Sequence, residues 1–259
     1  MGLIRLFISD IDGCLAEPYR PVPLEKWLIL ACRVQQAYEE HADRSVRPLF
    51  TVCSGRAYAY VEAITQVLAV QCPVLFEAGG GMFHLPEARI QWNEAFTPAI
   101  EQQLQEVAAW LKATCLPGTH MTYDFGKRTQ AGIIGPYPEE VQACVPRVRD
   151  YVEARYPDLR VFYTHVSIDI VPAAITKVQG LHWLARETGI PLKEMAYIGD
   201  SIGDLEALRA VGHAFAPANA TEEIKTVVDY VTRGTVIDGV LEAYARAEAH
   251  NRAVLATSP

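Results

Sequence analysis

Residues 3–13 read LIRLFISDIDG, in which a β-rich apolar run, Leu3–Ser9, ends in Asp10, Asp12 and Gly13. The run predicts a buried strand. Because ligands of open α/β sheets bind at the carboxyl ends of the strands, both carboxylates are expected at a binding edge. Confined carboxylates repel each other unless a cation compensates them. Gly13 would let the backbone turn and approach a ligand closely, although an acidic turn without a ligand is the alternative for this stretch alone.

The stretch Gly199-Asp200-Ser201-Ile202-Gly203-Asp204 repeats this arrangement after a second strand, which is predicted over Met195–Ile198. Asp200 or Ser201 could simply cap the helix predicted over Asp204–Val211. Two acidic strand ends in one sheet favour a different interpretation, because together they supply the hard oxygen ligands that Mg²⁺ prefers beside water and phosphate. The pattern therefore predicts a magnesium site at this edge.

Ser54, Gly55, Arg56 and Lys177 fit a phosphate site. Ser54 ends the strand predicted over Leu49–Cys53, and the following residues add backbone amides at a helix start, where anions bind. Lys177 opens another predicted helix, so that its ammonium could reach the sheet edge. Taken singly, Ser54 would be a helix cap and Lys177 a surface lysine. Their order along the chain favours the phosphate site.

Strand-length apolar runs alternate with amphipathic helical patterns on both sides of a central segment, which is typical of βαβ units around a parallel sheet. Between residues 86 and 174 the order changes to αββαββ, which is typical of an antiparallel α+β module. We therefore expect an α/β fold with a doubly wound, mostly parallel sheet from residues 1–85 and 175–259, and an inserted α+β domain from 86–174. The final helix is predicted over Asp238–His250, and the chain is expected to fray from Asn251 on.

The composition excludes several functions. The 259 residues include 23 Lys and Arg against 31 Asp and Glu, which gives a formal net charge of −8. Nucleic-acid and anionic-membrane binders need a basic face, so neither partner is expected. The sequence has no apolar run of transmembrane length and no signal-peptide pattern, and we expect a cytoplasmic protein, monomeric or homodimeric. The six scattered cysteines are typical of reduced core residues rather than of disulfides or a zinc site.

The stretches quoted above resemble, in order, the four motifs of the haloacid dehalogenase superfamily. The inserted domain resembles the C2 cap of subclass IIB, which includes Cof-like sugar phosphatases, sucrose-phosphate phosphatase and archaeal-type phosphoglycolate phosphatase. The resemblance implies a Mg²⁺-dependent phosphatase that acts on a small phosphorylated metabolite, either a sugar phosphate or a phosphoglycolate-like acid. A phosphomutase of the phosphomannomutase type and a non-catalytic binding protein on the same fold are the alternatives.

The resemblance also implies a role for each motif residue. Asp10 would be the nucleophile that forms an aspartyl-phosphate, and Asp12 would be the general acid and then the base. Mg²⁺ would be bound by Asp10, Asp200 and the backbone carbonyl of Asp12. The phosphoryl oxygens would be held by Ser54, Gly55 and Lys177. Support for these groups would come from Gly13, Arg56, Ser201 and Asp204.

Three positions depart from residues that are common in the superfamily. Cys14 stands where many relatives have Thr, and Gly203 stands where many have Asn. Ala78 replaces the Asn of a frequent Glu-Asn-Gly sequence, within Glu77-Ala78-Gly79. The last departure could alter the contact between core and cap.

The cap is expected to select the substrate, because it would close over the site and exclude water. Lys127 and Arg128 lie on its first predicted hairpin turn and could bind a carboxylate or a second anionic group, although a solvated turn is the better interpretation of this pair. His165 and Asp169 lie near its last predicted strand and could contact sugar hydroxyls.

Overall fold

The central sheet has five parallel strands in the computed structural model, which describes residues 2–40, 45–164 and 166–257. Their order is β12-β11-β10-β1-β2, with bounds Tyr230–Val231, His213–Ala216, Met195–Ile198, Leu6–Ser9 and Leu49–Val52. β1 lies between β10 and β2, and its Leu6 is opposite Met195 on one side and Leu49 on the other. The carboxyl ends of these three strands therefore lie at one edge of the sheet.

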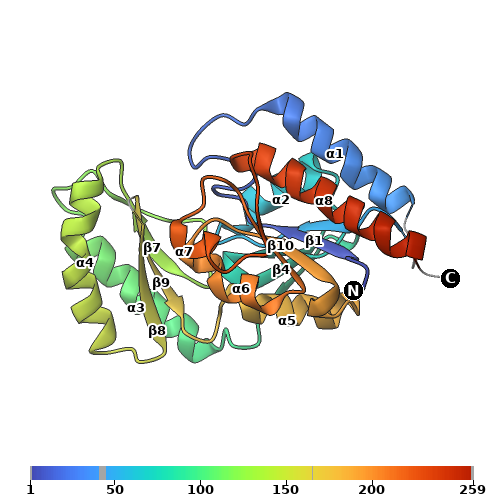
Figure 1. Cartoon of the computed structure of the whole chain (residues 1–259). Helices are drawn as coiled ribbons and strands as arrows, with labels where there is room; N and C mark the ends of the chain where they lie inside the picture. Colours follow the sequence, from blue (N-terminus) through green and yellow to red (C-terminus); the bar gives the residue numbers. More distant parts are fainter. Residues whose placement is uncertain (1, 41–44, 165, 258–259) are drawn as a thin grey trace.

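β1 is buried on both faces, which explains its nearly continuous apolar sequence. One face of the sheet is covered by α1 (Leu24–Glu39) and α8 (Val236–Thr257), and the other by α5 (Lys177–Thr188) and α6 (Leu205–Ala210) (Figure 1). This layering confirms the predicted α/β class with a doubly wound, parallel sheet.

A three-stranded sheet adjoins β2. It consists of β3 (Val74–Phe76), β4 (Gly81–His84) and β5 (Arg89–Trp92) in antiparallel order, and α2 (Tyr58–Val67) packs on it. A bridge between Cys53 and Leu75 joins β3 to the chain just after β2. The sequence patterns did not indicate β4 and β5, which are short and flank a turn, Leu85–Glu87, that contains Pro86. β5 begins beyond residue 86, where the inserted domain was predicted to start, yet it pairs with β4.

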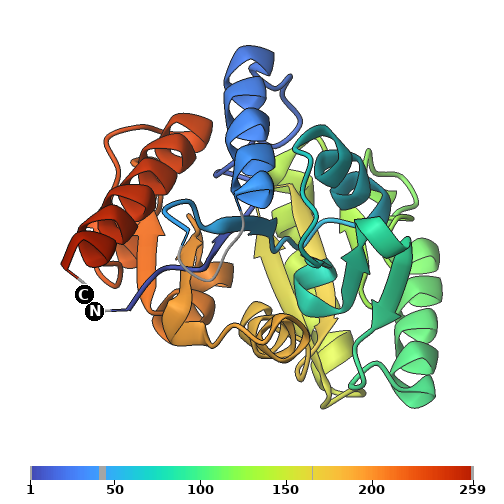
Figure 2. The same cartoon turned by 90° about the vertical axis from the view of Figure 1, so that its right-hand side faces the viewer.

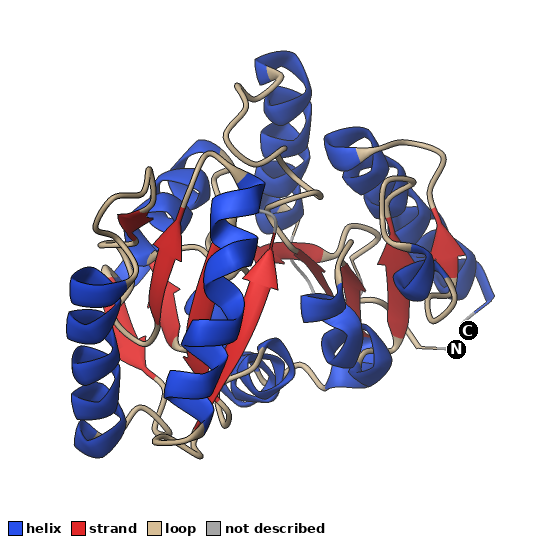
Figure 3. Cartoon of the chain, turned by 90° about the vertical axis from the view of Figure 1, so that its left-hand side faces the viewer, coloured by secondary structure: helices blue, strands red, loops and turns tan. Residues whose placement is uncertain are grey.

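The middle of the chain forms a separate antiparallel sheet in the order β6-β7-β9-β8. The elements follow the predicted order αββαββ: α3 (Pro98–Thr114), β6 (Thr122–Tyr123), β7 (Ala131–Ile134), α4 (Pro138–Glu153), β8 (Leu159–Thr164) and β9 (Ser167–Pro172). Both helices pack on one face of this sheet and form a second hydrophobic core with Ile133, Ile168 and Ile170. The helices lie on the side away from the central sheet, so the other face is turned toward it (Figures 1 and 3).

Two stretches of chain, residues 93–97 and 173–176, connect this inserted unit to the rest of the molecule. They run side by side, because Ala95 and Thr97 of the first line the same cavity of about 300 Å³ as Ala173 and Ala174 of the second. The two connections therefore form one joint between the units.

The last helix is longer than predicted. α8 continues to Thr257, so the expectation that the chain frays from Asn251 is wrong. The side chain of Asn251 is fully buried; it accepts a hydrogen bond from Ile4 N (2.8 Å) and donates to Ile4 O (2.7 Å) and Val46 O (3.1 Å). Figure 2 shows the end of α8 next to the start of the chain. These bonds satisfy backbone groups just before β1 and hold the helix end in place.

Smaller differences concern short elements. The helix predicted over Asp204–Val211 is divided into a 3₁₀ turn, Ile202–Asp204, and α6. The short α7 covers Glu222–Lys225. Five of the six cysteines are buried as expected, but Cys32 is exposed on α1. Among the helices of the described residues, none has the length and apolarity needed to cross a membrane.

Replacing Asn251 by Ala should lower the free energy of unfolding by about 3 kcal/mol, because it leaves three backbone groups near Ile4 and Val46 without partners. Urea denaturation followed by circular dichroism measures the loss. Arg252→Ala, on the exposed side of the same helical turn, is the control and should change stability by less than about 0.5 kcal/mol. Equal stability of the two variants would contradict the role of Asn251.

Candidate active site

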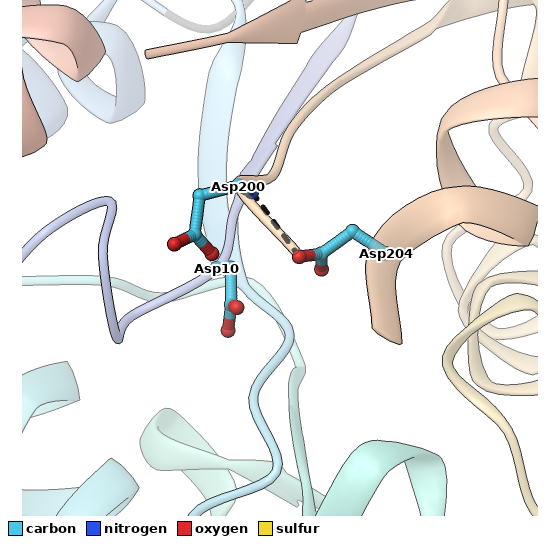
Figure 4. A group of neighbouring side chains, drawn as sticks. All are labelled: Asp10, Asp200 and Asp204. Atoms are coloured by element: carbon cyan, nitrogen blue, oxygen red, sulfur yellow. Dashed lines mark hydrogen bonds between the residues drawn. The ribbon is translucent and has the colours of Figure 1, made fainter. Parts of the chain in front are cut away.

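Three aspartates from two strand ends meet at the carboxyl edge of the central sheet. Asp10 directly follows β1, and Asp200 and Asp204 follow β10. Each offers a carboxylate oxygen, and these oxygens lie within 4.8 Å of one another (Figure 4). Asp10 and Asp204 are buried, whereas Asp200 is partly accessible. The structure thus brings the two predicted acidic strand ends together.

Gly13 makes the close approach of the two acidic loops possible. Its φ is +74°, and a Cβ atom at this position would lie 2.0 Å from Oδ2 of Asp200. Any other residue would therefore be strained and would displace the Asp200 carboxylate.

Lys177, the first residue of α5, lies inside the acidic cluster. Its Nζ is 2.8 Å from Oδ2 of Asp10 and 2.6 Å from Oδ1 of Asp204, and the side chain is only 9% exposed. The alternative of a surface lysine is therefore wrong. The side chain of Thr176 caps α5 by accepting a hydrogen bond from Gln179 N. This cap fixes the start of the helix at Lys177.

Asp204 closes the loop that carries Asp200. Its Oδ1 accepts a hydrogen bond from the hydroxyl of Tyr197 (2.7 Å), and its Oδ2 accepts from Asp200 N, Ser201 N and Ser201 Oγ (3.2 Å each). Gly199 leaves the room for this, since a Cβ there would lie 2.5 Å from Cγ of Asp204. With so many partners, Asp204 is a structural support for the loop.

The cluster carries more negative than positive charge. Burial raises the pKa of Asp10 well above its usual value; Lys177 opposes this effect, while Asp204 and Asp200 add to it. Burial, followed by the charge of Asp204, raises the pKa of Asp200 to about 7. One ammonium thus faces three carboxylates, and a hard divalent cation bound by carboxylate oxygens would relieve the imbalance. The acidic cluster has the composition of a metal site.

The carboxylate of Asp12 is bound by Arg56. The guanidinium donates two hydrogen bonds to the Asp12 carboxylate, Nε to Oδ2 and Nη2 to Oδ1, each 2.6 Å long. It lies over the rings of Tyr19 and Tyr60, with its Cζ 4.9 and 5.1 Å from their centroids. The hydrogen bonds to Asp12 raise the pKa of Arg56. Sequence reasoning gave Arg56 only a supporting part and missed that it fixes the side chain of Asp12.

Ser54 lies near the end of β1, because the preceding residue, Cys53, donates through N to Ser9 O. It is fully buried, and its Oγ accepts a hydrogen bond from Arg56 N (3.2 Å), so it orders the turn after β2 as the capping alternative suggested. A Cβ at Gly55 would meet no atom within 4 Å, so the backbone there borders open space.

The side chain of Lys127 is largely shielded from solvent. Its Nζ lies 2.7 Å from Oδ1 of Asp169 and 3.4 Å from Oδ2 of Asp124, and its side chain is 11% exposed. The turn also approaches the core, since a Cβ at Gly126 would lie 3.0 Å from Cβ of Ala57. The expectation of a solvated turn is therefore wrong for Lys127, which pairs with another predicted cap residue.

The side chain of Arg128 is engaged elsewhere. Its guanidinium contacts Glu101 (3.2 Å) and lies over the rings of Trp92 and Phe96. Half of this side chain is exposed, so the turn is solvated at this position. His165, the remaining predicted cap residue, lies outside the described residues.

Glu77 is a buried acid to which sequence reasoning assigned no role. It follows β3, as Asp10 follows β1, and this position was the available signal. Its carboxylate accepts hydrogen bonds from Arg128 N, Thr129 N and Thr129 Oγ1 of the inserted unit. Burial raises the pKa of Glu77. Glu77 and Ala78 both have left-handed backbone, with φ of +49° and +56°, which costs about 1 kcal/mol or more for each residue.

Known proteins with similar sequences are hydrolases. A family model described as haloacid dehalogenase-like hydrolase matches residues 134–243. A phosphoglycolate phosphatase of Methanothermobacter thermautotrophicus is 36% identical over 243 residues, which cover 94% of this chain and 98% of that protein.

Two solved structures share the fold of this chain. A Thermoplasma acidophilum protein has a TM-score of 0.73 at 22% identity and covers 95% of this chain and 99% of its own. Sucrose-phosphatase of Synechocystis, solved with sucrose and phosphate, has a TM-score of 0.66 at 14% identity over 95% and 99% of the two chains. The chain belongs to the haloacid dehalogenase superfamily of hydrolases, subclass IIB. Within that superfamily it is a phosphatase.

The raised pKa of Asp200 predicts how stability depends on pH without divalent cations. The folded protein holds this proton more tightly than the unfolded chain, whose aspartate pKa is near 3.8, so stability is lost as the pH rises from about 4 to about 7. In EDTA at pH 8, Asp200→Asn should therefore be more stable than the wild type by up to about 4 kcal/mol.

Urea denaturation at several pH values measures this difference, which should disappear below about pH 4. Asp150→Asn, at an exposed position of α4, is the matched control and should follow the wild type throughout. A pH-independent difference for Asp200→Asn would mean that the carboxyl proton is not its cause.

Proposed function

We propose that this protein is a Mg²⁺-dependent phosphatase that hydrolyses a small phosphorylated metabolite through an aspartyl-phosphate on Asp10. The observation that carries the proposal is the meeting of Asp10, Lys177 and Asp200 at one strand edge, where a nucleophilic carboxylate lies beside a cation and within an acidic cluster. The phosphatase relatives support it.

Asp10 is held in position to attack. One carboxylate oxygen, Oδ1, accepts a hydrogen bond from Ile11 N (2.7 Å), and the other, Oδ2, contacts Lys177. A carboxylate oxygen would form a bond to phosphorus as the ester P–O bond breaks. Lys177 would neutralise charge that develops on the transferred group.

Asp12 would move the protons. It would give one to the departing ester oxygen, and then take one from the water that cleaves the aspartyl-phosphate and releases inorganic phosphate. Arg56 keeps its carboxylate in one orientation by two hydrogen bonds, so the general acid would be in place before the substrate binds.

Mg²⁺ fits the cluster because its carboxylates outnumber the cations around them. Asp10, Asp200 and the backbone carbonyl of Asp12 would hold it, and its charge would offset the repulsion between the carboxylates and the phosphoryl group. The remaining phosphoryl oxygens would be bound by the Ser54 hydroxyl and the Gly55 amide. The loop that holds Asp200 would be kept in shape by Gly13, Ser201 and Asp204.

The inserted unit, predicted as residues 86–174, would act as a cap over this site. Lys127 and Asp169 lie in it as a paired cation and carboxylate and would contact the part of the substrate beyond the phosphate. The relative is named phosphoglycolate phosphatase, and one structure of the same fold is a sucrose-phosphatase solved with sucrose and phosphate. The substrate class proposed here is a phosphoglycolate-like acid or a sugar phosphate.

Asp10→Asn should abolish phosphate release, with at least a thousandfold loss expected, because the amide cannot act as the nucleophile. Release of phosphate from a panel of metabolite monoesters with Mg²⁺ measures it, and circular dichroism checks that the fold is kept. Asp238→Asn, an exposed aspartate of α8, should retain full activity. Substantial activity in Asp10→Asn would refute the nucleophile.

Chelation by EDTA should stop hydrolysis, and added Mg²⁺ should restore it. Binding should also be visible without turnover: Mg²⁺ at a hundredfold excess over its dissociation constant should stabilise the fold by about 2.7 kcal/mol, seen as a rise in melting temperature. Asp200→Asn should show a much smaller rise, because it lacks one of the proposed ligands. An identical rise in both proteins would place the ion elsewhere.

A further inference from the structure

Glu77 contacts both units of the molecule at once. It belongs to the core, where it follows β3, and the residue is 1% exposed. Its partners lie in the β6–β7 loop of the inserted unit: Thr129 donates through N (2.6 Å) and Oγ1 (2.7 Å), and Arg128 donates through N (3.0 Å). Thr129 is itself fully buried and packs against Gly80. The β6–β7 loop is thus hydrogen-bonded to the core through the carboxylate of Glu77.

The backbone at Glu77 is hydrogen-bonded to the loop Ser54–Arg56 of the core. Glu77 N donates to Arg56 O (2.9 Å), and Ala78 N donates to Ser54 O (2.8 Å). Arg56 in turn holds the Asp12 carboxylate through its guanidinium. A continuous set of hydrogen bonds therefore runs from the β6–β7 loop through Glu77 and Arg56 to Asp12.

The backbone conformation indicates that this connection is constrained. Glu77 and Ala78 are consecutive non-glycine residues with positive φ, a conformation that persists only where surrounding contacts impose it. Those contacts are the two hydrogen bonds to the Ser54–Arg56 loop and the bonds to Arg128 and Thr129.

We propose that Glu77 is a positioning residue that ties the cap loop to Arg56, so that Asp12 is oriented for proton transfer only when the cap is seated. The inference rests on the proposed phosphatase function. In this role Glu77 acts through Arg56 and not on the reacting atoms. Glu77→Gln keeps the size of the side chain but replaces one acceptor oxygen by an NH₂ group, which would face the amide of Arg128 or Thr129 without a partner.

The test compares two leaving groups. The p-nitrophenolate ion departs without a proton, whereas an alkoxide needs one from Asp12. In Glu77→Gln, kcat/KM should fall at least about tenfold for 2-phosphoglycolate or glucose 6-phosphate, whichever the wild type hydrolyses, and less than about threefold for p-nitrophenyl phosphate. Equal losses on both substrates, or no loss, would overturn the inference.

Thr129→Val is a milder variant that removes one of the bonds to Glu77, and it should show the same selective loss to a smaller extent. It provides the test if Glu77→Gln does not fold. Glu101→Gln is the control: it breaks the ion pair of the Arg128 side chain but leaves the bonds to Glu77, and it should behave as the wild type on both substrates.

Hydrogen exchange separates this inference from the proposed function, because it requires no activity. In Glu77→Gln, the amides of residues 54–57 and 126–130 should exchange faster together than in the wild type. Faster exchange confined to 126–130 would show that Glu77 only tethers the cap loop and would overturn the link to Arg56. A wild type that hydrolyses none of the monoesters would instead refute the phosphatase proposal.

Discussion

The contact of Lys177 with Asp10 and Asp204 is the interaction on which the site depends. All three side chains are almost completely buried, and carboxylates removed from water cost several kcal/mol each unless a cation and hydrogen bonds compensate them. Lys177 meets this need because α5 begins at that residue, beside the open edge of the sheet. A single ammonium group cannot neutralise the charge of three carboxylates. The arrangement that keeps these acids buried therefore also favours the binding of a further cation.

The fold and the centre of the site were predictable because they follow from short-range patterns. Asp10 and Asp200 come directly after buried apolar runs, and parallel pairing in register brings the ends of such strands together. The first residue of α5, Lys177, and both bounds of β10 match the prediction, because β10 is a compact apolar run and the helical pattern begins directly after the inserted unit.

What could not be predicted depends on partners far away in sequence. Asn251 is polar and close to the end of the chain, and only its contact with Ile4, 247 residues away, makes it a buried anchor. Arg56 lies 44 residues from Asp12, and Lys127 lies 42 residues from Asp169. Glu77 was passed over for the same reason, since its acceptor role appears only with the β6–β7 loop in place. Periodicity shows which face of an element is apolar, but it does not show which polar groups meet.

The joint formed by residues 93–97 and 173–176 has an evolutionary consequence. The inserted unit enters and leaves at one place and has its own hydrophobic core, so recombination at two neighbouring points could exchange it without rebuilding the sheet that carries Asp10. The inserted unit, proposed to select the substrate, and the core, proposed to cleave the ester bond, would then be inherited separately. A descendant protein could then gain an inserted unit that accepts other phosphate esters and retain the core that carries Asp10.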